Sequence, residues 1–156
     1  WGMLVNPLKT KALVISRSRA LMPIFPKLVL DSTVVERITE LKVLVVGLDA
    51  KLSFEGHIRS IAASASSKLG IMRKALCLFG DPVLVLRCFW SFLLPMLEYC
   101  SPVWMSAAAS HLCFLDRVVS KAVRLSDGLV VRDLKHRRRV AALCMFYKIY
   151  CNPIMP

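Results

Sequence analysis

The sequence predicts an α+β fold in which short antiparallel strands, including a hairpin, are followed by a four-helix bundle. Residues 1–53 alternate short β-prone runs with turn residues, a pattern typical of strands. After Ser53, apolar residues recur three and four positions apart, which is the helical period. We therefore expect strands in residues 1–53, helices in residues 54–128, and a basic helical segment in residues 129–156.

In the strand-rich part, three β-prone runs are bounded by turn residues, namely 11–16, 27–35 and 41–48. The dipeptide Asp31-Ser32 divides the middle run, so we expect a β-hairpin there. Residues 18–26 contain two prolines and no clear period, which predicts a loop. The run 41–48 is expected to form one strand.

The helical part is expected to hold four helices, at residues 54–79, 82–99, 110–125 and 133–150. Gly80 is expected to end the first helix in a left-handed conformation, and Asp81 to cap the second. Pro95 predicts a kink or break in that second helix. Because charged residues and Pro95 interrupt its apolar run before the roughly 20 residues that a bilayer requires, we expect a core helix and no membrane partner.

Charge and composition narrow the classes of partner. The net charge is +12, from 22 Lys and Arg against 10 Asp and Glu, which favours a polyanionic partner. The hydrophobic content of 56% indicates a missing partner segment, so we expect a piece of a longer polypeptide. The six cysteines lack metal-ligand spacing and are expected to be buried thiols in a reducing compartment, cytoplasmic or nuclear. No nucleophile and base are arranged as in a hydrolase.

Three stretches of the sequence are informative because of the order in which they occur. They are LVNPLKTKALVIS (4–16), ELKVLVVGLDAKLSFEGHI (40–58) and FLLPMLEYCSPVW (92–104). They resemble, in sequence and spacing, the end of the reverse transcriptase of jockey-like non-LTR retrotransposons. The first is similar to palm motif D, the second to motif E (the primer grip), and the third to a thumb signature. HRRRVAALCMFYKIY (136–150) resembles the segment after the thumb. The resemblance extends over nearly all 156 residues.

The resemblance implies the closing part of a palm followed by a thumb, in an RNA-directed DNA polymerase that holds an RNA or RNA/DNA template-primer. Such an enzyme binds Mg²⁺ with a Y-x-D-D loop and a further Asp. No two acidic residues are adjacent in this sequence. We therefore expect the chain to be catalytically incomplete, to hold no metal or other cofactor itself, and to require the N-terminal palm and fingers of the same polypeptide.

The resemblance also assigns site residues. Lys9 matches the motif D lysine, which is implicated in pyrophosphate release. The primer grip corresponds to Leu44, Val45, Val46 and Gly47, with Val45 standing where the family has glycine.

Further candidates are basic residues on helical faces, where they would contact phosphates without reading bases. They are Arg59, Arg73, Lys74, Arg117, Lys121, Arg124, Lys135, Arg137, Arg138 and Arg139. Solvated charged faces are the alternative. The aromatic residues of the second helix region, Phe89, Trp90, Phe92, Tyr99 and Trp104, are expected to lie in the core. For the chain as a whole, the alternative is a non-enzymatic helical interaction module or an inactive genomic remnant.

Overall fold

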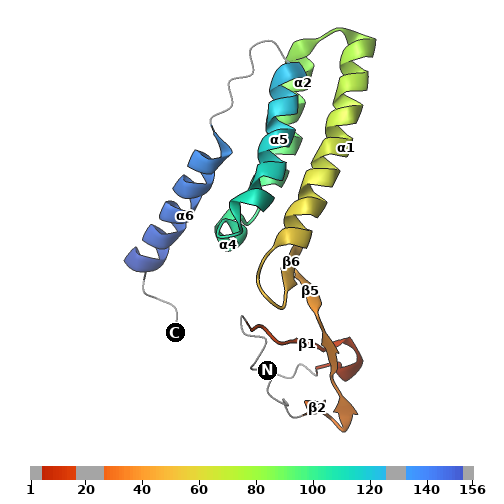
Figure 1. The fold of residues 1–156 in the computed structure, drawn as a ribbon, viewed down its shortest axis with the longest axis vertical. Helices are drawn as coiled ribbons and strands as arrows, with labels where there is room; N and C mark the ends of the chain where they lie inside the picture. The colour runs from red at the N-terminus through yellow and green to blue at the C-terminus, as the bar shows by residue number, and fades with distance from the viewer. Residues whose placement is uncertain (1–4, 17–26, 126–132, 153–156) are drawn as a thin grey trace. The chain divides into compact units, whose positions relative to one another are not determined.

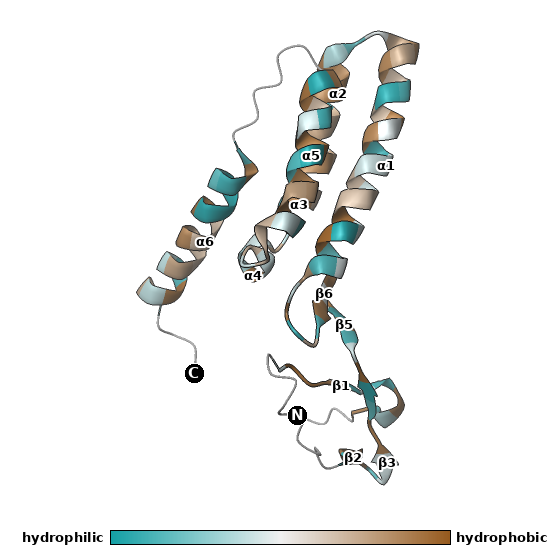
Figure 2. Cartoon of the chain, viewed as in Figure 1, coloured by the Kyte–Doolittle hydropathy of each residue, from teal (hydrophilic) through white to brown (hydrophobic). Residues whose placement is uncertain are grey.

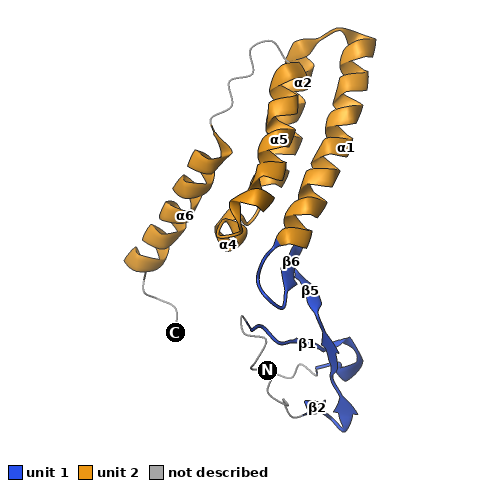
Figure 3. Ribbon diagram, viewed as in Figure 1, with its two compact units in different colours: residues 1–54 blue, residues 55–156 orange. Residues whose placement is uncertain are grey.

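The computed structural model describes residues 5–16, 27–125 and 133–152. It confirms the predicted mixed α+β class. Two compact units, residues 1–54 and 55–156, meet where the sequence changes from the strand pattern to the helical pattern (Figure 3). The predicted loop at residues 18–26 and the predicted boundary at residue 128 lie outside the described residues. Each unit is described by itself below.

Among its described residues, the first unit contains three two-stranded sheets and one short 3₁₀ helix (Figure 1). The elements are η1 (Pro7–Lys9), β1 (Lys11–Leu13), β2 (Val29–Leu30), β3 (Thr33–Val34), β4 (Glu36–Ile38), β5 (Glu40–Val43) and β6 (Val46–Asp49). The β2–β3 hairpin confirms the predicted turn, with Asp31 at φ 47° and Ser32 at φ 63°. Both values lie in the left-handed region that two-residue hairpin turns require.

The pairing of β1 corrects the expectation of antiparallel strands. β1 pairs with β4 in parallel, with Lys11 opposite Glu36, and the two side chains form an ion pair at 3.4 Å. Strand β4 was not predicted from the sequence. A parallel pair requires a long crossover connection, so no local turn signal announces it.

The predicted strand at residues 41–48 is also wrong. It is an antiparallel hairpin, in which β5 and β6 are joined at Leu44 (φ 45°) and Val45 (φ 74°). Neither residue favours positive φ, and a β-branched side chain is strained there. The hairpin places Leu44 and Val45 at an exposed tip, while Val46 is buried.

Asp49 organises the loop that follows β6. Its carboxylate accepts hydrogen bonds from the backbone N–H groups of Lys51 (2.8 Å), Ser53 (3.1 Å) and Phe54 (2.8 Å), and from the Ser53 hydroxyl (2.9 Å). Burial raises the pKa of Asp49, but these hydrogen bonds outweigh burial and hold that pKa below its ordinary value. The carboxylate thus holds the loop by accepting from three of its backbone N–H groups and one hydroxyl.

In the second unit, the first helix and its end follow the prediction. α1 (Glu55–Phe79) ends at Gly80, which has φ 64° and donates its N–H to the Leu76 carbonyl. Asp81 then accepts a hydrogen bond from the Val83 N–H at 2.8 Å and caps α2 (Pro82–Cys88). α2 and α5 (Ala109–Leu125) both pack against α1 (Figure 1).

The helix after Gly80 widens in its middle. α2 continues into the π-helical turn η2 (Phe89–Leu93) and then into α3 (Leu94–Glu98). The Leu94 N–H donates to the Phe89 carbonyl, five residues back. Pro95 lacks an N–H and its ring crowds the carbonyl of the preceding turn, so a wider turn just before it relieves the clash. The predicted irregularity is therefore present as a π turn beside Pro95.

The described part of this unit contains two further helices. α4 (Ser101–Trp104), which the sequence reading did not include, follows Cys100 at φ 52°. α6 (Leu134–Cys151) confirms the predicted last helix, with Asp133 as its N-cap. Figure 2 shows that α6 is hydrophilic in its first turns and more apolar toward its end.

The core of the second unit is made by one face of each packed helix. Its largest fully buried side chains are those of Ile58, Phe89, Leu93, Leu97, Trp104 and Leu115. The prediction that five aromatic residues lie in the core holds for Phe89 and Trp104 and is wrong for Trp90, Phe92 and Tyr99, which are 42%, 67% and 48% exposed. The six cysteines are half-buried or exposed, not buried as predicted. Within the described residues, no helix combines the length and the apolar character that a membrane span requires.

Candidate nucleic-acid interface

Five of the predicted basic residues line one groove between α1 and α5. Two adjoining cavities, of about 300 Å³ and 390 Å³, share Ser66 and Lys121 in their linings. Together they form the α1–α5 groove, whose cations are Arg59 and Arg73 on α1, and Arg117, Lys121 and Arg124 on α5. The structure therefore brings together cations that are up to 65 positions apart in the sequence.

Helical spacing explains why these cations share the groove. Arg59 and Arg73 are two heptads apart on α1, so they lie within about 40° of each other around the helix axis. Arg117, Lys121 and Arg124 are four and three positions apart on α5 and occupy one face in the same way. Gly70 of α1 also lines the groove, and the space beside it is open, since a Cβ added there would meet no atom within 4 Å.

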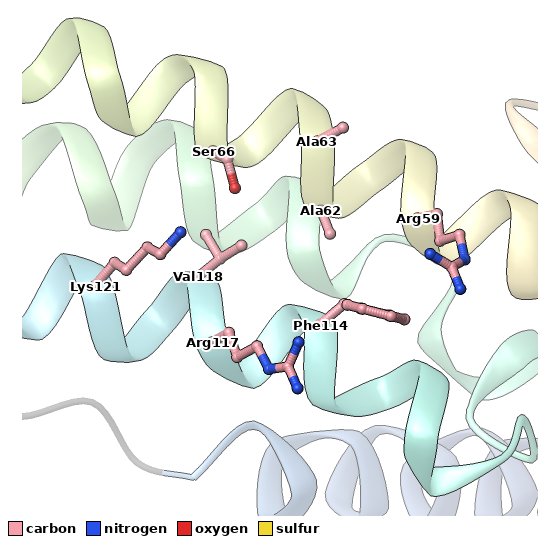
Figure 4. Close-up of a pocket in the computed structure, with 8 residues that line it drawn as sticks. All are labelled: Arg59, Ala62, Ala63, Ser66, Phe114, Arg117, Val118 and Lys121. Atoms are coloured by element: carbon pink, nitrogen blue, oxygen red, sulfur yellow. The ribbon is translucent and has the colours of Figure 1, made fainter.

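Phe114 is the aromatic member of the groove (Figure 4). The Cζ atoms of Arg59 and Arg117 lie 4.7 Å and 5.4 Å from the centroid of its ring. The attraction between a guanidinium and the ring face holds both cations beside one half-buried aromatic side chain. The sequence reading missed Phe114, although it precedes Arg117, Lys121 and Arg124 by three, seven and ten positions and so shares their face.

The charged residues that line the groove are all cations, among those that the structure describes. None of the lining residues that the structure describes is acidic. Near one end, Glu55 accepts a hydrogen bond from Arg59 Nε at 2.8 Å, and its other carboxylate oxygen lies 3.8 Å from His111 Nε2. The remaining cations of the groove repel one another, and an anion between them would relieve that repulsion.

The basic run at the start of α6 is divided between different roles. Arg137 donates hydrogen bonds to both carboxylate oxygens of Glu98 on α3, and this contact raises the pKa of Arg137. Arg138 is buried and its Nη2 lies 3.5 Å from Asp116 on α5. These two cations hold α6 against the other helices. Lys135 and Arg139 are exposed.

The remaining predicted positions are not among the described residues that line the groove. Lys74 is exposed on α1 and is not among the described lining residues. In the first unit, Lys9 is the exposed last residue of η1, and its aliphatic neighbour Leu8 is 84% exposed. Of the primer-grip positions, Leu44 and Val45 form the β5–β6 turn and are 81% and 63% exposed, while Val46 and Gly47 are the first residues of β6.

The Mg²⁺ site implied by the resemblance does not fit the part of the chain that the structure describes. No group of three His, Cys, Asp or Glu side chains there lies close enough to hold a metal ion. A two-metal phosphoryl-transfer site requires such a cluster of carboxylates. Comparison with protein-family models, with curated proteins and with solved structures finds no match for this chain.

Proposed function

We propose that the chain binds nucleic acid through its sugar–phosphate backbone along the α1–α5 groove, as the palm-end and thumb portion of a non-LTR reverse transcriptase. The observation that carries the proposal is the convergence of five predicted cations on one groove without an acidic lining residue among those described. Arginine and lysine side chains in such a row bind phosphates and give little sequence readout. The partner is therefore an RNA or RNA/DNA template-primer held by shape and charge.

The geometry of the β5–β6 turn supports the reverse-transcriptase part of this proposal. Val45 occupies the position where the primer-grip motif has glycine, and its φ of 74° is a conformation that glycine adopts without strain. The backbone here has the shape that the motif's glycine would explain, although valine is present. Under this proposal the turn is the primer grip in a form that valine has strained.

Polymerisation itself belongs, in this proposal, to carboxylates elsewhere in the same polypeptide, where they would bind the Mg²⁺ ions. The contribution of this chain is positional. Cations that hold the template-primer reduce the entropy lost when the reactive ends are aligned. Lys9 is proposed as a charge donor toward the leaving pyrophosphate once that active site is assembled.

The test is a fluorescence-anisotropy titration of a labelled RNA/DNA hybrid at several salt concentrations. Affinity should fall linearly on a log–log scale, because each neutralised phosphate releases counterions. A variant with Arg73, Lys121 and Arg124 all changed to Gln should bind more weakly and with a shallower slope. The matched control changes Lys135, Arg139 and Lys148 of α6 to Gln, which removes the same charge away from the groove. Equal losses in both variants, or a salt-independent affinity, would reject the proposal.

One observation favours the alternative function, a helical protein-interaction module. The second half of α6 is exposed on several large apolar side chains, including Leu143 (67%), Phe146 (68%) and Tyr150 (76%). The rings of Phe146 and Tyr150 stack with their centroids 6.2 Å apart. Concentration-dependent association in sedimentation experiments, together with no binding of the hybrid, would support this second function.

A further inference from the structure

We infer that the α1–α5 groove takes an unpaired stretch of nucleic acid, with one base stacked at Phe114 and the flanking phosphates held by Arg73, Lys121 and Arg124. This inference rests on the proposed function and names its substrate more narrowly. Single-strand sites in proteins combine a basic groove with an aromatic platform for bases. The groove has both features at one end.

The surroundings of Phe114 favour a flat ligand. The facing wall of the cavity is built by Ala62 and Ala63 of α1, whose side chains are single methyl groups (Figure 4). Arg59 and Arg117 stand beside the ring. A guanidinium stacks on an aromatic ring and on a nucleobase alike, because it is planar and only weakly hydrated. A planar base can therefore take the place of one of these guanidinium groups on the Phe114 ring.

The guanidinium groups can also bind a phosphate when a base is bound. Arg59 already divides its contacts between the Phe114 ring and the Glu55 carboxylate, 2.8 Å away. A phosphate next to the bound base offers the same kind of oxygen acceptor as Glu55. The cation can therefore turn from the ring to the backbone while the base takes its place on the ring.

The width of the groove argues against a paired base at this site. Packed helices lie about 8–10 Å apart, so the space between their side chains is narrower than a duplex. A duplex laid over the groove would present only its outer phosphates, because its bases are paired and stacked inside. Contact with Phe114 requires a base that has left the stack.

The length of the groove sets the size of the bound stretch. Phe114 and Arg124 are ten positions apart on α5, or about 15 Å along the helix. At a rise of about 3.4 Å per nucleotide, this distance corresponds to about four nucleotides of a stacked strand. An oligonucleotide of eight nucleotides is therefore long enough to occupy the whole groove.

The deciding experiment compares two labelled eight-nucleotide strands with the 156-residue chain. One is oligothymidylate, and the other is an abasic strand with the same number of phosphates. The base-bearing strand should bind at least about 5-fold more tightly, because stacking of one base contributes that much or more. Phe114→Leu should abolish this preference, whereas Phe114→Tyr, which keeps the ring, should retain it.

Each result separates this inference from the proposed function. Equal, salt-dependent affinities for the two strands would overturn the inference and leave backbone binding in place. A preference that persists in Phe114→Leu would also overturn it, because the base would then stack elsewhere. Absence of binding to both strands and to the hybrid would overturn both proposals. The comparison of strands on the unmodified chain stands even if Phe114→Leu fails to fold.

Discussion

Arg137 of α6 and Glu98 of α3 form a two-point ion pair, in which one guanidinium donates hydrogen bonds to both carboxylate oxygens. The second of these bonds, from Nη2 to Oε2, measures 2.8 Å. The side chains are only 34% and 22% exposed. Since α6 has few buried residues, among them Leu134 and Arg138, this pair is a principal attachment of that helix.

Arg137→Ala should loosen α6 without unfolding the rest of the second unit. We expect the attachment of α6 to weaken by about 1–2 kcal/mol, because charge-assisted hydrogen bonds are lost but the site is partly solvated. Amide hydrogen exchange along α6 measures the change. Lys135→Ala, on an exposed position of the same helix, is the control and should leave exchange unaltered. Unchanged protection in Arg137→Ala would show that the pair does not hold the helix.

Val45→Gly should stabilise the β5–β6 hairpin. Valine at φ 74° is strained, and glycine removes that strain, for a gain of about 1 kcal/mol after its greater chain entropy is counted. The matched control is Val43→Gly, in β5, where the extended backbone offers glycine no advantage and the change should destabilise. Exchange rates of the β5–β6 amides measure both effects. A loss of protection in Val45→Gly would contradict the strained turn.

Asp49→Asn should weaken the loop after β6 in a pH-dependent manner. Because the folded-state pKa of Asp49 lies below its ordinary value of 3.8, its contribution is fully present above that value. The contribution is lost as the pH falls through the lowered folded-state pKa. At neutral pH, Asn should cost about 1–2 kcal/mol, since its amide accepts fewer of the four hydrogen bonds.

Exchange of the amides of residues 51–54, followed from neutral to acid pH, checks this prediction. The difference between the two proteins should shrink toward low pH. Asp31→Asn, in the exposed β2–β3 turn, is the control, because Asn tolerates the same left-handed backbone. A pH-independent difference would mean that the charge of Asp49 is not what stabilises the loop.

Lys121 should be the single most informative cation of the groove, since it lines both adjoining cavities. Lys121→Gln should weaken binding of nucleic acid and reduce the salt slope by about 1, the value for one lost phosphate contact. Lys148→Gln, on the exposed end of α6, removes the same charge and should leave the slope unchanged. Identical slopes for the two variants would place the phosphate contacts outside the groove.

The local features of this fold were predictable, and the non-local ones were not. Gly80, Asp81 and Pro82 each fix the backbone of their own position, so the end of α1 and the start of α2 follow from the sequence. The parallel pairing of β1 with β4 joins residues 25 positions apart and leaves no such mark. The β5–β6 turn was hidden for another reason: Leu44 and Val45 are not turn residues, so LKVLVVGL resembles one buried strand.

In the candidate site too, local features were predictable from the sequence and non-local contacts were not. Helical periodicity placed Arg59 with Arg73, and Arg117 with Lys121 and Arg124, but it gave no reason for the two rows to face each other. That arrangement depends on the packing of α1 against α5. Arg137 and Arg138 were grouped with their basic neighbours because their partners, Glu98 and Asp116, are distant in the sequence. Partners of this kind decide whether a cation stabilises the fold or is available for a ligand.

The π turn at η2 also has a consequence for how this helix tolerates insertions and deletions. It accommodates one more residue per turn than an α-helix would, and both Phe89 and Leu93 remain buried across it. The loss of one residue here would convert the π turn into an ordinary α-helical turn, with the hydrogen bond to the Phe89 carbonyl donated from four residues ahead. The residues beyond would keep their orientation, so Leu97 would stay in the core and Glu98 would stay opposite Arg137. This turn can therefore lose one residue, whereas a deletion elsewhere in α2 or α3 would rotate everything beyond it by about 100°.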